Sequence, residues 1–154
     1  MPKAVLHTDG GCSPNPGPGG WAYVLELDGV VSECVGGDAA TTNNRMELTA
    51  VIRGLEATQE GMAVELVADS EYVLKGITEW MVNWKKNDWT RKVKGKRKPL
   101  LNTELWQRLD TLVNARTVTC TWVRGHSGHN LNERCDALVN SVHDAFRRGD
   151  PVPE

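Results

Sequence analysis

Two short β-type segments, each followed by an aspartate, constrain the fold more than any other feature of this sequence. Residues 3–9 alternate between apolar and polar positions and end at Asp9, and the mostly apolar residues 63–68 are closed by Asp69. Between them, an amphipathic helical pattern runs over about residues 42–57. A strand, a helix and a second strand in this order predict two parallel neighbouring strands joined by a crossover helix.

The remaining patterns predict further strands and helices that complete an α/β domain with a mixed sheet. Residues 21–27 and 30–35 are expected to form a hairpin, because the Asp28-Gly29 pair between them favours a tight turn. Segments that are dense in glycine and proline, or in charge, are expected to be loops. The other expected elements are loops over 10–20 and 88–98, a short helix from the N-cap Ser70 to about Gly76, a Trp-rich helix from about Thr78 to Asn87, a helix over 100–114 with Leu101 on its apolar stripe, a strand over 117–123, and a last helix whose stripe includes Cys135, Val139 and Val142.

Length and composition fit one ordinary globular domain. At 154 residues the chain can bury a single core, and we expect one domain over residues 1–147 with a frayed tail over 148–154. No apolar run is long enough to cross a bilayer, and the first residues lack the pattern of a signal peptide. The four cysteines show no CxxC spacing, so reduced thiols are expected. These features predict a cytoplasmic protein without a membrane partner.

Positive charge is concentrated in one short segment. The formal net charge of the chain is -2, yet residues 85–98 contain eight Lys or Arg against the single acid Asp88, which is a local charge of +7. The rest of the chain therefore carries a charge of -9. A basic strip on an otherwise acidic protein predicts a polyanionic partner that is held at one place.

Four carboxylates are placed to meet at one edge of the predicted sheet. Asp9 and Asp69 each follow a strand, and the carboxyl ends of parallel strands open on the same crevice. Glu47 lies beside the apolar stripe of the crossover helix, and Asp136 holds the same border position on the last helix. Each acid alone has an ordinary role in a turn or at a helix start. Four together repel one another unless cations neutralise them, and oxygen-only ligands predict Mg²⁺ or Mn²⁺.

Two further motifs contain residue types that are typical of ligand sites. The glycine-rich segment 10–20 lacks the Gly-Lys-Ser/Thr ending of a P-loop, so it gives nucleotide binding little support. His126 and His129, together with Cys135 and Cys120, form an alternative set of zinc ligands. Because Cys135 falls on an apolar helix stripe, its position favours packing over metal binding.

An ordered series of short motifs resembles one enzyme family. The series runs from about residue 3 to about residue 142 and is similar to ribonuclease H of type 1, of the bacterial kind. Any one motif is weak, but the ordered set is specific. Its members are Thr8-Asp9-Gly10, Asn15-Pro16-Gly17-Pro18-Gly19, Thr41-Thr42-Asn43-Asn44-Arg45-Met46-Glu47-Leu48, Asp69-Ser70 with Tyr72-Val73, Asn83-Trp84-Lys85-Lys86, and Gly125-His126-Ser127-Gly128-His129 with Asn132-Glu133-Arg134-Cys135-Asp136.

The resemblance implies a fold, an activity and a catalytic set. The fold would be a mixed five-stranded sheet flanked by helices, and the protein would be a monomer that hydrolyses the RNA strand of an RNA–DNA hybrid. Two Mg²⁺ ions, or Mn²⁺ in their place, would activate water and stabilise the leaving oxygen. The products would carry 5′-phosphate and 3′-hydroxyl ends. The implied metal ligands are Asp9, Glu47, Asp69 and Asp136, and His126 would assist proton transfer or product departure.

The resemblance also implies contacts with the hybrid. One group of residues would approach the minor groove, where 2′-hydroxyls distinguish RNA from DNA. A Trp-rich, basic protrusion would grip the DNA strand, and a small pocket would hold a phosphate. At Glu71, bacterial members usually carry glutamine, which leaves an RNA contact there open. The implied groove residues are Cys12, Asn15, Asn43, Asn44 and Glu71, those of the protrusion are Trp80, Trp84, Lys85 and Lys86, and those of the pocket are Thr42 and Asn102.

Two other functions compete with this hypothesis. A catalytically silent hybrid-binding module would keep the basic strip and could lose its acids, yet all four carboxylates are present. Another nuclease or integrase of the same fold is the second alternative, since a fold alone does not determine the substrate. The basic strip and the loop around His126 favour the hybrid-cutting function.

Overall fold

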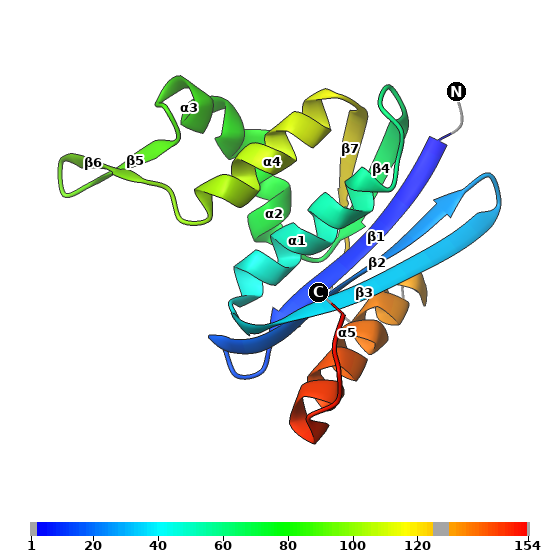
Figure 1. Ribbon diagram of the computed structural model, residues 1–154. Coiled ribbons are helices and arrows are strands. Elements are labelled where there is room, and N and C mark those ends of the chain that lie inside the picture. The colour runs from blue at the N-terminus through cyan, green and yellow to red at the C-terminus, as the bar shows by residue number, and fades with distance from the viewer. Residues whose placement is uncertain (1–2, 125–129, 154) are drawn as a thin grey trace.

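A mixed five-stranded sheet forms the centre of the protein. The computed structural model describes residues 3–124 and 130–153. The strands of this sheet lie in the order β3-β2-β1-β4-β7, and a separate two-stranded hairpin, β5-β6, projects from the body of the protein (Figure 1). The strands are β1 (Lys3–Cys12), β2 (Gly17–Leu27), β3 (Val30–Thr41), β4 (Ala63–Ala68), β5 (Thr90–Val93), β6 (Lys96–Pro99) and β7 (Thr117–Trp122).

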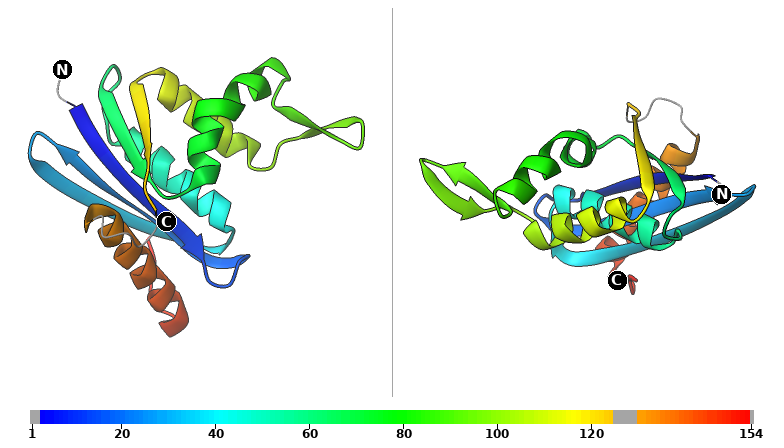
Figure 2. Two further views of the ribbon diagram at one scale, coloured as in Figure 1. Left: turned by 180° about the vertical axis from the view of Figure 1, so that it is seen from behind. Right: turned by 90° about the horizontal axis from the view of Figure 1, so that it is seen from above.

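Helices cover both faces of the sheet. Figure 1 shows α1 in front of β1, and the view from behind in Figure 2 shows α5 in front of the strands. None of the described helices is long and apolar enough to cross a membrane. The helical segments are α1 (Asn43–Glu56), α2 (Glu71–Lys75), the π-helical turn η1 (Gly76–Trp80), α3 (Met81–Lys86), α4 (Thr103–Asn114) and α5 (Asn130–Arg148).

The strand–helix–strand prediction is confirmed. β1 pairs in parallel with β4, and His7 lies opposite Val67 in this register. Asp9 and Asp69 each follow two residues later, so the register brings them to the same level of the sheet. The α1 helix connects the two strands, and the side chain of Thr42 caps its first turn as expected.

Two apolar layers hold the helices on the sheet. On one face, the stripe of α1 that includes Leu48, Val51 and Leu55 is buried against residues of β1, β2 and β4. On the other face, Cys135 and Val139 of α5 pack against alternate residues of β2. Because successive side chains of a strand point to opposite faces, β2 contributes to both layers.

The predicted loop over residues 10–20 is mostly strand. β1 extends to Cys12 and β2 begins at Gly17, so only residues 13–16 connect them. The glycines of this segment serve close packing, since a Cβ at Gly10 would lie 2.5 Å from the main-chain carbonyl carbon of Met46. Glycine has a backbone N–H group that can pair in a β-ladder, so a segment rich in glycine can form strands. A loop prediction based on composition does not take this into account.

The predicted loop over residues 88–98 is also wrong, because residues 90–99 form the β5-β6 hairpin. Its turn is Lys94-Gly95, where both residues have positive φ angles of 52° and 79°. Such a turn matches the twist of a two-stranded ribbon. The density of charge in this segment had suggested irregular structure, but alternating charged residues are compatible with an exposed ribbon.

Three smaller predictions are also corrected. Gly76 does not end a helix, because α2, η1 and α3 follow one another without a break; a Cβ at Gly76 would meet the ring of Trp106 at 2.0 Å, so glycine is needed there for packing. Leu101 was placed on an apolar stripe but is 69% exposed, since α4 begins only at Thr103. The tail expected to be frayed lies along β3, where Gly37 N–H donates to Pro153 O at 2.6 Å.

Candidate active site

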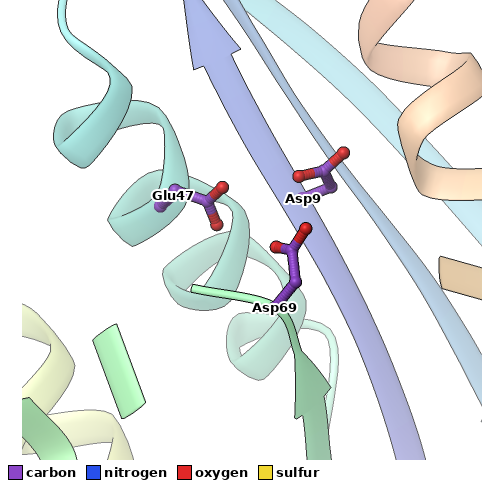
Figure 3. Close-up of side chains that lie close together, drawn as sticks. All are labelled: Asp9, Glu47 and Asp69. Atoms are coloured by element: carbon purple, nitrogen blue, oxygen red, sulfur yellow. The ribbon is translucent and has the colours of Figure 1, made fainter. Parts of the chain in front are cut away.

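Three carboxylates converge at the end of the sheet. Asp9 comes from β1, Glu47 from the second turn of α1, and Asp69 from the residue directly after β4 (Figure 3). Among the described residues, one oxygen of each lies within 4.8 Å of the others. The absence of a side chain at Gly10 lets α1 approach β1 closely enough to bring Glu47 into this group.

Burial and repulsion between carboxylates disfavour the charged forms of Asp9 and Glu47. Burial raises the pKa of Asp9 from 3.8 to about 7, and the negative charges of Asp69 and Asp136 contribute to the rise. Burial is also the largest cause that raises the pKa of Glu47 well above 4.5, followed by the charges of Asp9 and Asp69. A bound cation reverses this balance because it stabilises the ionised carboxylates.

The donor set fits a hard divalent cation. Glu47 Oε2 is buried and has no hydrogen-bond partner among the described residues, which leaves it available to a metal. The three groups provide only oxygen ligands, the type that Mg²⁺ and Mn²⁺ prefer. The expected cluster of Asp9, Glu47 and Asp69 is therefore present.

Asp136 lies beside this cluster. It is carried by α5, and its charge contributes to the raised pKa of Asp9. Its Oδ2 accepts a hydrogen bond from Asn140 Nδ2 at 3.4 Å. The group of three described above does not include it, so its role as a fourth metal ligand stays a prediction. His126, the fifth predicted catalytic residue, lies outside the described residues.

Hydrogen bonds that the sequence patterns did not indicate hold the segments of the chain that bear these acids. The indole Nε1 of Trp122 donates to Asp69 O at 3.2 Å, and Val123 N–H donates to Ala68 O at 3.0 Å. These bonds fix the chain where it leaves β4. Trp122 is nevertheless 50% exposed, so its pattern in the sequence showed only a strand residue and gave no signal of this contact.

The start of α5 is also anchored from a distance. His7 Nδ1 lies 2.7 Å from Asn132 Oδ1, and Asn132 Nδ2 donates to Val67 O at 3.2 Å. Asn132 thereby links the helix that carries Asp136 to both β1 and β4. Cys135 Sγ donates to His7 O at 3.4 Å from a fully buried position, which supports its packing role over the zinc alternative.

The predicted groove residues form a connected set at the start of α1. Cys12 N–H donates to Asn43 Oδ1 at 2.7 Å, and Asn43 N–H donates to Asn15 Oδ1 at 3.1 Å. Asn15, Asn43 and Asn44 are exposed. The end of β1, the connection to β2 and the first turn of α1 therefore present one polar surface, with Thr42 Oγ1 accepting from Arg45 N–H at 3.2 Å.

The predicted protrusion residues divide between packing and solvent. The rings of Trp80 and Trp84 contact each other in a tilted arrangement, and Trp84 packs edge-to-face against the buried Trp106. At least part of the tryptophan cluster is therefore structural, as expected for such side chains. Lys85 and Lys86 are both exposed, and Lys85 Nζ lies 3.2 Å from Asp110 Oδ2.

Asn102 and Glu71 have local partners. Asn102 Oδ1 accepts from Arg45 Nη1 at 3.1 Å, and Asn102 Nδ2 donates to Tyr72 OH at 3.3 Å. Glu71 is exposed in the first turn of α2, and its Oε2 lies 3.8 Å from Lys75 Nζ. Glu71 therefore lies where its negative charge interacts favourably with the N-terminal end of α2. A contact between Glu71 and RNA stays a prediction.

The architecture and the carboxylate cluster together define an α/β protein of the class that holds divalent cations at the carboxyl ends of parallel strands. Comparison with known proteins gives the family. Residues 1–143 match the family model described as RNase H. The chain belongs to the ribonuclease H family.

Curated relatives and solved structures agree with this assignment. The chain is 54% identical to a ribonuclease H of Pseudomonas fluorescens over 142 residues. The aligned region covers 92% of this chain and 93% of the relative. It is 56% identical, with the same coverage, to ribonuclease HI of Pseudomonas syringae pv. tomato. The fold matches that of LC9-RNase H1, a type 1 RNase H with the type 2 active-site motif, at a TM-score of 0.80 and 29% identity over 99% of this chain and 75% of the other. It also matches LC11-RNase H1, solved in complex with an RNA/DNA hybrid, at a TM-score of 0.69 and 25% identity over 93% and 99% of the two chains.

Proposed function

We propose that this protein is an endonuclease that hydrolyses the RNA strand of RNA–DNA hybrids. The observation that carries the proposal is the convergence of Asp9, Glu47 and Asp69 at the positions that match the family's motifs. The family match over residues 1–143 and the hybrid bound to LC11-RNase H1 support the choice of substrate.

The carboxylates would hold two Mg²⁺ ions, with Mn²⁺ as a substitute. Asp9, Glu47 and Asp69 supply carboxylate oxygens that lie close together, and Asp136 is carried by α5. Two such ions, when bound, activate the attacking water and stabilise the leaving oxygen. The ends left on the products would be 5′-phosphate and 3′-hydroxyl, and His126 would assist proton transfer or product departure.

Two surfaces would hold the hybrid. The polar surface formed by Cys12, Asn15, Asn43 and Asn44 suits the minor groove and its 2′-hydroxyls. The β5-β6 hairpin carries its cations on both faces of the ribbon, and in the described part of the chain none of these cations is ion-paired to an acid. The resemblance to the family supports three further proposed contacts. Glu71 would contact the minor groove, and Thr42 and Asn102 would contact a phosphate. The protrusion contacts would come from Trp80, Trp84, Lys85 and Lys86. A cytoplasmic monomer stays a prediction, and the four free cysteines fit a reducing compartment.

A cleavage assay tests the proposed function. Labelled RNA–DNA hybrid, duplex RNA and duplex DNA are incubated with the protein, with and without Mg²⁺, and the product ends are determined. We expect cuts in the RNA strand of the hybrid alone, and only with the metal. Binding of the hybrid without any metal-dependent cleavage would favour the silent module, and cleavage of duplex DNA would favour another nuclease of this fold.

The basic hairpin should provide a measurable share of the electrostatic affinity. Replacing Lys94, Lys96, Arg97 and Lys98 with glutamine is expected to weaken hybrid binding and to flatten its salt dependence. Each phosphate contact that is lost should reduce the logarithmic salt slope by roughly 0.7–0.9. Turnover at saturating hybrid should remain, because these residues lie on β6 and its turn, away from the carboxylates.

Two substitutions at the end of α5 control for a general effect of lost positive charge, although they remove two charges and the hairpin variant removes four. Arg147 and Arg148 lie at the end of α5 and are paired with Asp144 and Asp150. Changing both to glutamine should leave the salt slope nearly unchanged. An unaltered slope in the hairpin variant would show that the hairpin does not contact phosphates.

A further inference from the structure

Arg45 stands beside the polar surface at the start of α1. It lines a hollow of about 470 Å³ whose other walls include Pro16, Gly17 and Thr42. The N-terminal end of a helix favours anions, and a guanidinium adds a full positive charge with several donors. Arg45 therefore lies where a backbone phosphate of a bound nucleic acid would be attracted.

In the structure, an acid of the protein already binds this guanidinium. Arg45 Nη1 donates to Glu104 Oε1 at 2.6 Å and to Asn102 Oδ1 at 3.1 Å. The hydrogen bond from Arg45 lowers the pKa of Glu104, so the carboxylate stays ionised at neutral pH. The side chain of Glu104 is 65% exposed and that of Arg45 is 38% exposed, so solvent and ligands can reach the pair.

We propose that Glu104 competes with a substrate phosphate for Arg45 and so limits the affinity for the hybrid. This inference rests on the proposed function, because it assigns a role within the same binding surface. Glu104 occupies the guanidinium in the free protein, and a phosphate would have to displace the carboxylate to reach it. Exposed ion pairs contribute little to folding, so the exchange is feasible.

The fold offers a matched control for this pair. Glu56 and Arg108 form a second exposed ion pair between α1 and α4, with Glu56 Oε2 at 3.0 Å from Arg108 Nη2. It joins the same two helices as the Arg45–Glu104 pair but sits at the opposite end of α1, away from the polar surface. Glu56→Gln removes the same charge and the same type of contact, so it measures the effect of net charge alone.

The experiment compares binding of a short labelled RNA–DNA hybrid to the full chain and its variants without divalent metal, at low and at moderate salt. We expect Glu104→Gln to tighten binding by roughly three- to tenfold at low salt, and the gain to shrink as salt rises. Under cleavage conditions its KM should fall by a similar factor while kcat changes little. Glu56→Gln should alter affinity less than twofold.

A double-mutant cycle assigns the gain to Arg45. In the Arg45→Gln background, adding Glu104→Gln should no longer tighten binding appreciably. Thermal unfolding of each variant verifies that all are folded. If Glu104→Gln binds the hybrid equally well or more weakly, or if its gain persists without Arg45, the competition is refuted. Failure of the wild-type protein to bind or cleave the hybrid would instead refute the proposed function, so the two failures are distinguishable.

Discussion

Asp69→Asn is expected to abolish cleavage while leaving a folded protein that still binds the hybrid. The substitution keeps the shape of the side chain but removes one of the three converging carboxylate charges. We expect turnover to fall by at least ~100-fold, because loss of a ligand should cost more than the 10–100-fold typical of losing its outer partners. Calorimetric titration with Mn²⁺ should show weaker binding in parallel.

Asp28→Asn provides the matched control for this change. Asp28 lies in the turn between β2 and β3, at the opposite end of these strands from the cluster. Its φ angle is 52°, a conformation that asparagine also adopts readily. The control should keep full activity and Mn²⁺ affinity. Near-normal turnover of Asp69→Asn would remove Asp69 from the catalytic site.

The sequence predicted those parts of the site that depend on local patterns. The parallel pairing of β1 and β4 follows from strand–helix–strand order, and the register then brings Asp9 and Asp69 together. Glu47 could be placed because it borders the apolar stripe of α1, which is buried as predicted. These inferences succeeded because periodicity, capping and chain topology agree with one another.

Other features could not be predicted because they depend on partners far away in the sequence. The bond from Trp122 to Asp69 O and that from Arg45 to Glu104 join residues 53 and 59 positions apart. The patterns predict a loop at Gly10 and a helix end at Gly76, although the role of these glycines is to admit Met46 and the ring of Trp106. Composition shows that glycine is flexible, but only the packed structure shows what approaches it.

The second large effect concerns stability and pH. Burial first, and then the charges of Asp69 and Asp136, raise the pKa of Asp9 from its ordinary value of 3.8 to about 7. Between about pH 4 and pH 7, the folded protein therefore keeps a proton that the unfolded chain has released. Under this condition the free energy of unfolding decreases as pH rises. Without metal, the protein should thus become less stable from pH 5 to pH 8.

Asp9→Asn should remove the part of this pH-dependent loss that comes from Asp9, while the raised pKa of Glu47 keeps a remainder. In the presence of a chelator at pH 8, we expect the variant to exceed the wild type in free energy of unfolding by on the order of 1–3 kcal/mol, with a smaller difference at pH 5. Denaturant unfolding at both pH values measures this, and Asp28→Asn should show no such trend. Added Mn²⁺ should stabilise the wild type more at pH 8 than at pH 5, since ligands must be deprotonated to bind. It should stabilise Asp9→Asn little. A variant no more stable than wild type at pH 8 would mean that the carboxylate cluster is not strained without metal, and that the cation is not what offsets its repulsion.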